Sequence, residues 1–324
     1  MNAPQIPSIS VIDPINPAIE RVRTILFRPF DLGKWFVIGF CAWLAQLGNA
    51  GGGGGGGGNK GQYNIDQSSV RHEISQAWRY VVDNLDWIIP AAAAVIVIFI
   101  GVWLLLLWLS SRGRFMFLYC VAQNKAEVTD PWHRFQSHAG SLFAFRAVVG
   151  LITLGAAVVP FVVGGIVVSA STATLGFTPL TIVGLVAAGM YFIAVMIVSA
   201  VIGKFTKDFV VPIMYLHAIR ATAAWRVLLD VLSVNKGRFV LYVLVQMAMA
   251  MAIGAMMFMA VCCTCCLAAC LFILPYIGTV VLLPIHIFTR SYSLYYLAQY
   301  GPEFNVFAPS SDPARPTQSA GTAP

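Results

Sequence analysis

The chain has 324 residues, of which 59% are hydrophobic and only 10% are charged, and its mean hydropathy is +0.79. Because soluble domains average about 25% charged residues, this composition cannot provide a water-facing surface, and it predicts an all-α polytopic membrane protein. The composition excludes a secreted enzyme, a disordered adaptor and a cytosolic nucleotide-binding protein. The basic residues behind the net charge of +7 fall in short clusters between apolar runs, so they indicate membrane topology rather than nucleic-acid binding.

Two terminal tails are expected to flank one membrane domain at residues 17–305. Residues 1–16 and 306–324 are rich in Pro, Ser and Ala, so we expect both tails to be unstructured. No apolar stretch of the signal-peptide type precedes the first membrane span, and we therefore expect that span to act as an uncleaved anchor.

Apolar runs define the predicted elements of this domain. A helix needs about 17 to 25 apolar residues to cross a hydrocarbon core about 30 Å thick. Five runs meet this length and the first nearly does, so we predict about six transmembrane helices, at residues 35–50, 87–110, 147–170, 179–203, 239–260 and 266–288. None contains Asp, Glu, Lys or Arg, which disfavours a proton-coupled pump. Gln46 and Gln246 lie inside spans and are expected to form interhelical hydrogen bonds.

The distribution of Lys and Arg predicts the orientation of the spans. With six spans, seventeen of the twenty basic residues fall on one face, and only Lys60, Arg71 and Arg79 fall on the other. The face richer in Lys and Arg is normally cytoplasmic. We therefore expect a bacterial inner-membrane protein with both termini in the cytoplasm, and with anionic lipid headgroups as partners of the cytoplasmic face.

Each odd-numbered span follows a segment that predicts an amphipathic interfacial helix. These segments begin at Ala18, Pro131 and Ala224. In the third, apolar side chains recur along one helical face: Trp225, Leu228, Leu229 and Leu232. This spacing is typical of a helix that lies in the plane of the membrane surface.

Each even-numbered span leads into a segment in which aromatic residues stand beside cationic ones. These exit segments begin at Arg112, Lys207 and Leu282. Together with the interfacial helices they indicate a threefold internal repeat. A second explanation stays open, because any protein with several spans has basic and aromatic residues where each span meets the membrane surface.

An outer insertion separates the first two spans. Eight glycines, at residues 51–58, predict a flexible spacer. Residues 70–86 then place their apolar side chains on one helical face. This helix either packs against lipid or the bundle, or binds a protein partner outside the membrane. The glycines beside Lys60 lack the Gly-Lys-Ser/Thr order of a phosphate loop, so we expect no nucleotide cofactor.

Five of the seven cysteines crowd together in the hairpin that joins the fifth span to the last: Cys262, Cys263, Cys265, Cys266 and Cys270. Cysteine is a small apolar residue that fits a tight helical hairpin, so structural packing is one explanation. The predicted topology places the cluster outside the cytoplasm, where a disulfide could join the turn. Interleaved Cys-x-x-Cys spacings also fit a soft metal or dithiol chemistry.

His286 and Arg290 are the other candidate site residues. His286 follows Pro284 near the inner end of the last span, and Arg290 lies just beyond it. His286 either hydrogen-bonds a carbonyl that the proline leaves free or, together with Arg290, acts in gating or lipid contact. The sequence contains no nucleophile elbow, paired carboxylates or zinc motif, so we expect no catalytic residue, no metal site and no enzymatic activity.

Three strings are familiar from other proteins: FRPFDLGKWFVIGFCAWLAQLG before the glycine tract, the CCTCC hairpin, and PYIGTVVLLPIHIFTRSYSLYYLAQYGPEF. The chain resembles a family of uncharacterised bacterial integral membrane proteins over most of residues 18–307. Its helix layout is also similar to the membrane region attached to some glycerophosphodiester phosphodiesterases. The resemblance implies a membrane protein of unassigned function, without the phosphodiesterase catalytic domain and without residues whose role can be transferred.

Three functions fit these observations. The first is a non-catalytic scaffold or accessory protein that interacts with lipid or with partner proteins, and the basic interfacial segments favour it. The second is a transporter or channel for a small neutral or lipid-like solute, since Pro160, Pro275 and Pro284 interrupt spans as at some binding sites. The third, a membrane-embedded enzyme, depends only on the cysteines and His286.

Overall fold

The computed structural model describes residues 9–47, 83–174, 179–264 and 274–308. Over these residues the chain is helical apart from turns and an isolated β-bridge between Phe27 and Phe30. The elements are α1 (Ile15–Leu26), α2 (Leu32–Gln46), α4 (Leu85–Gln123), α5 (Thr129–Arg134), α6 (Gln136–Thr174), α7 (Pro179–Phe205), the π-helical turn η2 (Thr206–Val210), α8 (Val211–His217), α9 (Ala221–Val234), α10 (Lys236–Cys263), α12 (Pro275–Val281), α13 (Leu283–Ala298) and the 3-10 turn η3 (Pro302–Phe304).

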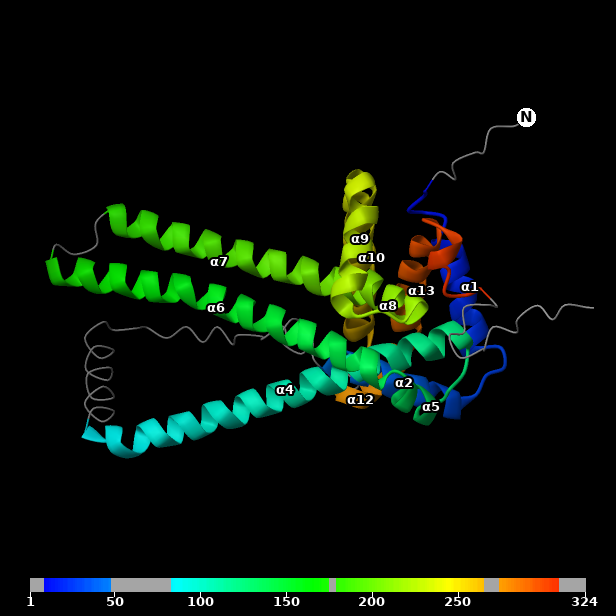
Figure 1. Cartoon of the computed structure of the whole chain (residues 1–324), viewed down its shortest axis with the longest axis horizontal. Coiled ribbons are helices and arrows are strands. Elements are labelled where there is room, and N and C mark those ends of the chain that lie inside the picture. The colour runs from blue at the N-terminus through cyan, green and yellow to red at the C-terminus, as the bar shows by residue number, and fades with distance from the viewer. Residues whose placement is uncertain (1–8, 48–82, 175–178, 265–273, 309–324) are drawn as a thin grey trace, which may run out of the picture.

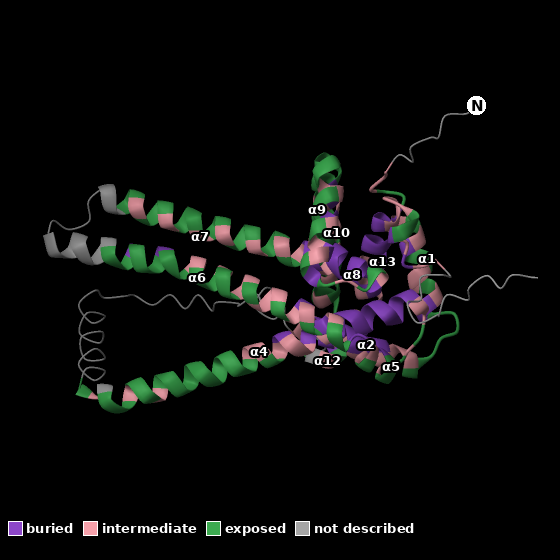
Figure 2. Cartoon of the chain, in the orientation of Figure 1, coloured by how far each residue is buried: buried purple, intermediate pink, exposed green. Residues whose placement is uncertain are grey.

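Within the described residues, four helical stretches are long and apolar enough to cross a membrane: Asp86–Gln123, Gln136–Ile166, Ile182–His217 and Lys236–Cys263. The chain is therefore a multi-pass membrane protein. Figure 1 shows α6 and α7 running side by side, while α4 diverges from them with distance from its packed end. The outer parts of α4, α6 and α7 expose their apolar side chains (Figure 2), as expected of helices whose solvent is lipid.

The shorter helices pack around the inner ends of α4, α6 and α7, where α10 lies beside α9 at a large angle to α6 and α7, and they form a compact unit, which we call the base (Figure 1). Buried residues gather there (Figure 2), and many are aromatic. Tyr242 of α10 lies 4.6 Å from Tyr296 of α13 between ring centroids, and Phe209 of η2 lies 5.3 Å from Phe239. Such ring pairs add to the free energy gained from burial, so the base is a closely packed core.

The first predicted span belongs to the base. Residues 35–46 of this span lie in α2, whereas residues 48–50 lie outside the described residues. The helix α2 has 15 residues and begins after Asp31, whose side chain accepts hydrogen bonds from the first-turn amides. Lys34 Nζ donates to Asn124 Oδ1 over 2.8 Å, and Ser110 Oγ donates to the Ala45 carbonyl over 3.0 Å. These contacts align α2 antiparallel to residues 110–124, at the packed end of α4. The membrane crossing predicted for the first span is therefore not confirmed.

The sixth predicted span is also unconfirmed. Its residues 266–273 lie outside the described residues. The remainder is divided between α12 and α13, which meet at Leu282, and Pro284 stands in the first turn of α13, where a missing amide hydrogen is tolerated. The outer insertion, including most of the predicted helix at 70–86, also lies outside the described residues.

The two tails predicted to be unstructured are ordered where they meet the base, so this prediction was wrong for residues 9–16 and 306–308. Ser10 exchanges two hydrogen bonds with the Gln299 side chain, of 2.7 and 2.9 Å, and Val306 is buried. Composition could not indicate this, because the contacts join residues 289 positions apart. Both ends of the described chain therefore lie at the base (Figure 1).

Candidate functional site

The three predicted exit segments meet in the base. Arg114 belongs to the end of α4, Lys207 and Asp208 to η2, and Arg290 to α13. Arg114 lies within electrostatic range of both Asp208 and Arg290. The fold thus brings together charged side chains from segments that are more than 80 residues apart in the sequence.

The π-helical turn η2 positions two of these side chains. It joins α7 to α8 within one continuous helical stretch, and it buries Thr206, Asp208 and Phe209. A π-helical turn widens the helix locally and is frequent at functional sites. Here it places Asp208 inside the core, at 3% exposure, although the segment begins directly after an apolar membrane helix.

Asp208 is the acceptor of a polar network between helices. Tyr242 Oη donates to Asp208 Oδ2 over 3.1 Å, and Lys204 Nζ forms an ion pair with the same oxygen at 3.2 Å. Gln246 Nε2 donates to Tyr242 Oη over 2.8 Å, and its Oε1 accepts from Lys204. The interhelical hydrogen bond predicted for Gln246 is confirmed.

Positive charge exceeds negative charge in this cluster. In the part of the chain that the structure describes, one acid and three further bases interact electrostatically with Lys207: Asp208, Arg114, Arg290 and Lys204. Arg146 of α6 adds a fifth base beside Arg114, and its guanidinium donates to Ser110 and Ser111 over 3.2 and 3.1 Å. Because a buried charge without an opposite charge is costly, this arrangement favours an anion as an additional partner. We call these five bases and Asp208 the basic cluster.

Arg290 is an enclosed base with a donor to spare. Its side chain is buried, at 5% exposure, and one terminal nitrogen donates to the Lys207 carbonyl. Its Nε has no hydrogen-bond partner among the described residues. Burial lowers the pKa of Arg290 to about 10, so the guanidinium stays charged at neutral pH.

His286 lies one turn before Arg290 on α13. Its Nε2 lies 3.2 Å from Gln46 Nε2, so the interhelical hydrogen bond predicted for Gln46 is confirmed. The described partner of the His286 ring is therefore this amide rather than a carbonyl freed by Pro284. Both predicted site residues, His286 and Arg290, line one small cavity of about 70 Å³, together with Gln46, Lys207, Asp208 and Thr289. That volume holds a few water molecules or a small anion.

A larger apolar groove lies between α7, α10 and α13. Its volume is about 690 Å³, and its walls include Ile197, Met247, Gly254 and Phe288. Its polar wall residues are Lys204, Gln246 and Thr289. Thr289 also lines the small cavity, so the groove and the basic cluster adjoin.

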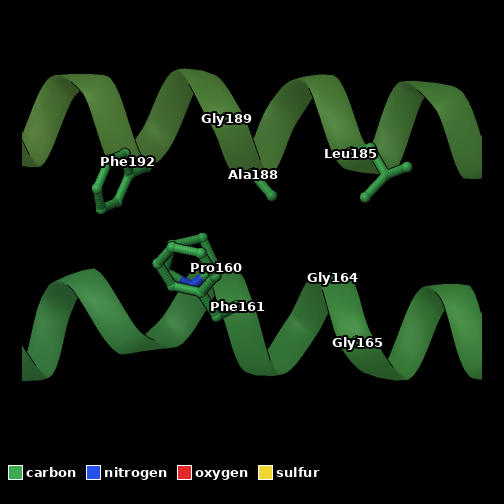
Figure 3. A pocket seen from close by; sticks show the side chains of 8 residues that line it. All are labelled: Pro160, Phe161, Gly164, Gly165, Leu185, Ala188, Gly189 and Phe192. Atoms are coloured by element: carbon green, nitrogen blue, oxygen red, sulfur yellow. The ribbon is translucent and has the colours of Figure 1, made fainter. Parts of the chain in front are cut away.

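A second apolar gap, of about 550 Å³, separates the outer parts of α6 and α7. Figure 3 shows Pro160 and Phe161 on one helix facing Phe192 on the other, with Gly164 and Gly189 providing little side-chain bulk. The Phe161 and Phe192 rings meet edge to face at 5.5 Å. No charged side chain lines this gap, so it offers contact to an acyl chain without a polar anchor.

The predicted cysteine cluster is described only in part. Cys262 and Cys263 are exposed free thiols at the end of α10, whereas Cys265, Cys266 and Cys270 lie outside the described residues. The described residues contain no group of three or more His, Cys, Asp or Glu side chains that could hold a metal ion. A pair that the sequence analysis did not single out, Cys41 and Cys120, is buried between α2 and α4, with the sulfur atoms 3.9 Å apart.

Comparison with known families identifies the group to which this architecture belongs. A family model described as a family of unknown function, DUF7544, matches residues 9–275. The chain belongs to this family. The match includes α1 to α10, and so every member of the basic cluster except Arg290. No curated protein and no solved structure matches the chain.

Sequence reasoning on this DUF7544 member missed the basic cluster as a site. It predicted cationic residues beside aromatic ones in each exit segment, but it treated Arg114 and Lys207 as separate residues at the membrane surface. The threefold pattern in the sequence could have indicated this site, because equivalent segments of a repeat can meet around one symmetry axis. Asp208 gave a second signal, since an acid beside a lysine directly after an apolar helix is costly unless it is paired.

Proposed function

We propose that the protein is a non-catalytic scaffold or accessory protein of the membrane that gathers anionic lipid at its base. The observation that supports this function best is the charge balance of the basic cluster, in which five bases face one acid. Basic pockets between membrane helices bind anionic headgroups, and each exposed cation at the membrane surface, such as Arg23 or Arg28, adds about 1 kcal/mol.

The turn between α1 and α2 supports contact with the membrane surface. It exposes Phe27, Phe30 and Leu32, at 50, 60 and 59%, beside the exposed Arg28. Trp35 contacts both phenylalanine rings and donates to the Leu26 carbonyl over 3.0 Å. Aromatic residues next to cations are typical of segments at headgroup depth, so this turn is a suitable membrane anchor.

The proposal includes the finer architecture predicted from the sequence. The base faces the cytoplasm of a bacterial cell, six spans cross the inner membrane, and the three span pairs form a repeat. The likeness of the layout to the membrane region of glycerophosphodiester phosphodiesterases is part of the same proposal, as is a protein partner for the outer helix at 70–86. The distribution of seventeen basic residues against three supports the orientation.

The lipids that co-purify with the full chain test this function. We expect phosphatidylglycerol to be enriched over phosphatidylcholine in nanodiscs formed from an equal mixture of the two. Arg23 and Arg28 are exposed, so the double variant Arg23→Gln with Arg28→Gln should lower the enrichment, by about 1 kcal/mol for each lost cation, without unfolding the chain.

The matched control for this test is Glu20→Gln on the same helix. Glu20 pairs with Arg23 at 2.8 Å, and both side chains are more than half exposed. Removal of this acid should leave stability nearly unchanged and should raise the enrichment. Equal lipid ratios in the wild type and in both variants would contradict the proposed function.

A transporter or channel for a small neutral or lipid-like solute is the second candidate. The groove of about 690 Å³ between α7, α10 and α13 favours it, because a lateral opening of this size can admit a lipid-like molecule. Single cysteines placed along α7 and α10 should then react with a water-soluble thiol reagent along the length of a path. Uniform protection of these positions would reject transport of a soluble substrate.

A further inference from the structure

We propose that the groove between α7, α10 and α13 binds one anionic phospholipid, with an acyl chain along its apolar walls and the phosphate at the Thr289 end, facing the basic cluster. This inference rests on the proposed function and makes it specific. It assigns one site and one class of ligand, whereas the lipid gathered by the surface of the base need not occupy any fixed position.

The walls of the groove fit a hydrocarbon chain. Two of the three helices that line the groove, α7 and α10, are long and apolar enough to cross a membrane, and the volume of about 690 Å³ lies in the range of small-molecule sites. Methionines Met247, Met249 and Met257 form much of one wall, and their flexible thioether side chains adapt to ligands of irregular shape. Gly254 leaves the wall open, because a Cβ atom built there would meet no atom within 4 Å.

The polar end of the groove fits a phosphate. Lys204, Gln246 and Thr289 gather there, and the side chain of Lys204 is one-third exposed despite its ion pair with Asp208. Beyond Thr289, the small cavity adds Lys207 and Arg290, and the buried Nε of Arg290 has a hydrogen available for a further acceptor. Basic pockets between membrane helices commonly bind phospholipid headgroups.

Charge complementarity favours an anionic occupant over a neutral lipid. Asp208 balances one base, and its Oδ2 oxygen already accepts from Tyr242 and pairs with Lys204. A phosphodiester would supply a negative charge together with acceptor oxygens, and charge-assisted hydrogen bonds of this kind are stronger than neutral ones. A phosphocholine lipid brings its own cation to the same place, and so we expect it to bind more weakly.

The experiment uses the full chain, purified in mild detergent and stripped of lipid. Binding of phosphatidylglycerol, phosphatidylcholine and inorganic phosphate is measured separately by native mass spectrometry and by thermal stabilisation. We expect phosphatidylglycerol to bind at one site at least about tenfold more tightly than phosphatidylcholine.

Two variants test the two ends of the site. Gly254→Phe places a ring at the groove wall, where a Cβ atom meets no atom within 4 Å, and Lys207→Gln removes a cation beside the polar end of the groove. Each should weaken phosphatidylglycerol binding by about tenfold or more. The matched controls are Gly155→Phe on α6, where a Cβ likewise meets no atom within 4 Å, and Lys236→Gln at the exposed start of α10. Both controls should bind the lipid within about twofold of the wild type.

Three results would overturn the inference. In the first, Gly254→Phe binds phosphatidylglycerol as tightly as the wild type, and in the second, the two lipids bind equally. In the third, inorganic phosphate stabilises the wild type and Gly254→Phe alike while phosphatidylglycerol does not bind, which would indicate a site for a free anion. The nanodisc enrichment depends on surface cations and should persist in Gly254→Phe. If this enrichment were lost while phosphatidylglycerol still bound at the groove, the result would reject the proposed function but not the lipid site in the groove.

Discussion

Replacement of Asp208 by Asn removes the one acid from the basic cluster and preserves the shape of the side chain. Asp208 is 3% exposed, pairs with Lys204 at 3.2 Å and accepts from Tyr242 at 3.1 Å. Removal of one partner of a buried ion pair typically costs about 3–5 kcal/mol. Because the Lys204 side chain is one-third exposed, water screens part of this loss, and we expect the lower end, about 3 kcal/mol.

The assay is thermal unfolding of the purified chain in detergent, with and without phosphatidylglycerol. For a chain of 324 residues, a loss of about 3 kcal/mol corresponds to a fall in Tm of roughly 4–5 °C. Without the Asp208 carboxylate the cluster should bind an anionic lipid more tightly, so phosphatidylglycerol should raise the Tm of Asp208→Asn by more than it raises that of the wild type.

The control for this prediction is Asp230→Asn, at an exposed position on α9, which should change stability by less than about 0.5 kcal/mol. Equal Tm values for Asp208→Asn and Asp230→Asn would refute the view that Asp208 offsets the surrounding bases. A lipid effect on Asp208→Asn no larger than that on the wild type would refute the role assigned to the lipid.

Two further predictions concern packing in the base. Gly113→Leu should destabilise the protein by about 3 kcal/mol or more, because a Cβ atom there would lie 2.5 Å from the backbone nitrogen of Ala45. The control is Gly101→Leu, where a Cβ atom would meet no atom within 4 Å. Equal Tm values for these two variants would contradict the close approach of α2 to α4. Tyr242→Phe should lower the free energy of unfolding by about 1–3 kcal/mol, since its hydroxyl links Gln246 to Asp208, and an unchanged Tm would exclude that network as a source of stability.

The sequence was sufficient to predict the long helices. The predicted spans at 87–110, 147–170, 179–203 and 239–260 all fall within helices of membrane-spanning length, because an apolar run of this length has few stable conformations other than a helix in lipid. The predicted ends were less accurate, since α4 continues to Gln123 without a break where the sequence suggested a separate exit segment. Hydropathy falls at the membrane surface, but the hydrogen bonds of a helix continue beyond it.

Hydropathy alone could not assign the first and last predicted spans. The apolar residues of α2 are buried against protein, with Ile38 and Cys41 fully buried, and an apolar helix inside a protein core has the same composition as one that faces lipid. Its length of 15 residues does not decide the assignment either, because it falls between the roughly 10–14 residues typical of a core helix and the roughly 17 or more of a span.

The candidate site was predictable only in its parts. Gln46, Gln246, His286 and Arg290 were identified individually, each as a polar residue at an unusual position. Their assembly depends on contacts between helices that no local pattern specifies, such as the 240 positions that separate Gln46 from His286.

Labelling of two exposed positions with a membrane-impermeant thiol reagent tests the central claim most directly, namely that the long helices cross the membrane with the base on the cytoplasmic side. Asp83→Cys lies at the outer start of α4, and Val234→Cys lies at the end of α9 in the base, where Val234 is 81% exposed. Each is made in a background whose hairpin cysteines are replaced by serine. In right-side-out membrane vesicles, position 83 should react at once, and position 234 only after permeabilisation. Labelling of position 234 in sealed vesicles would contradict the account.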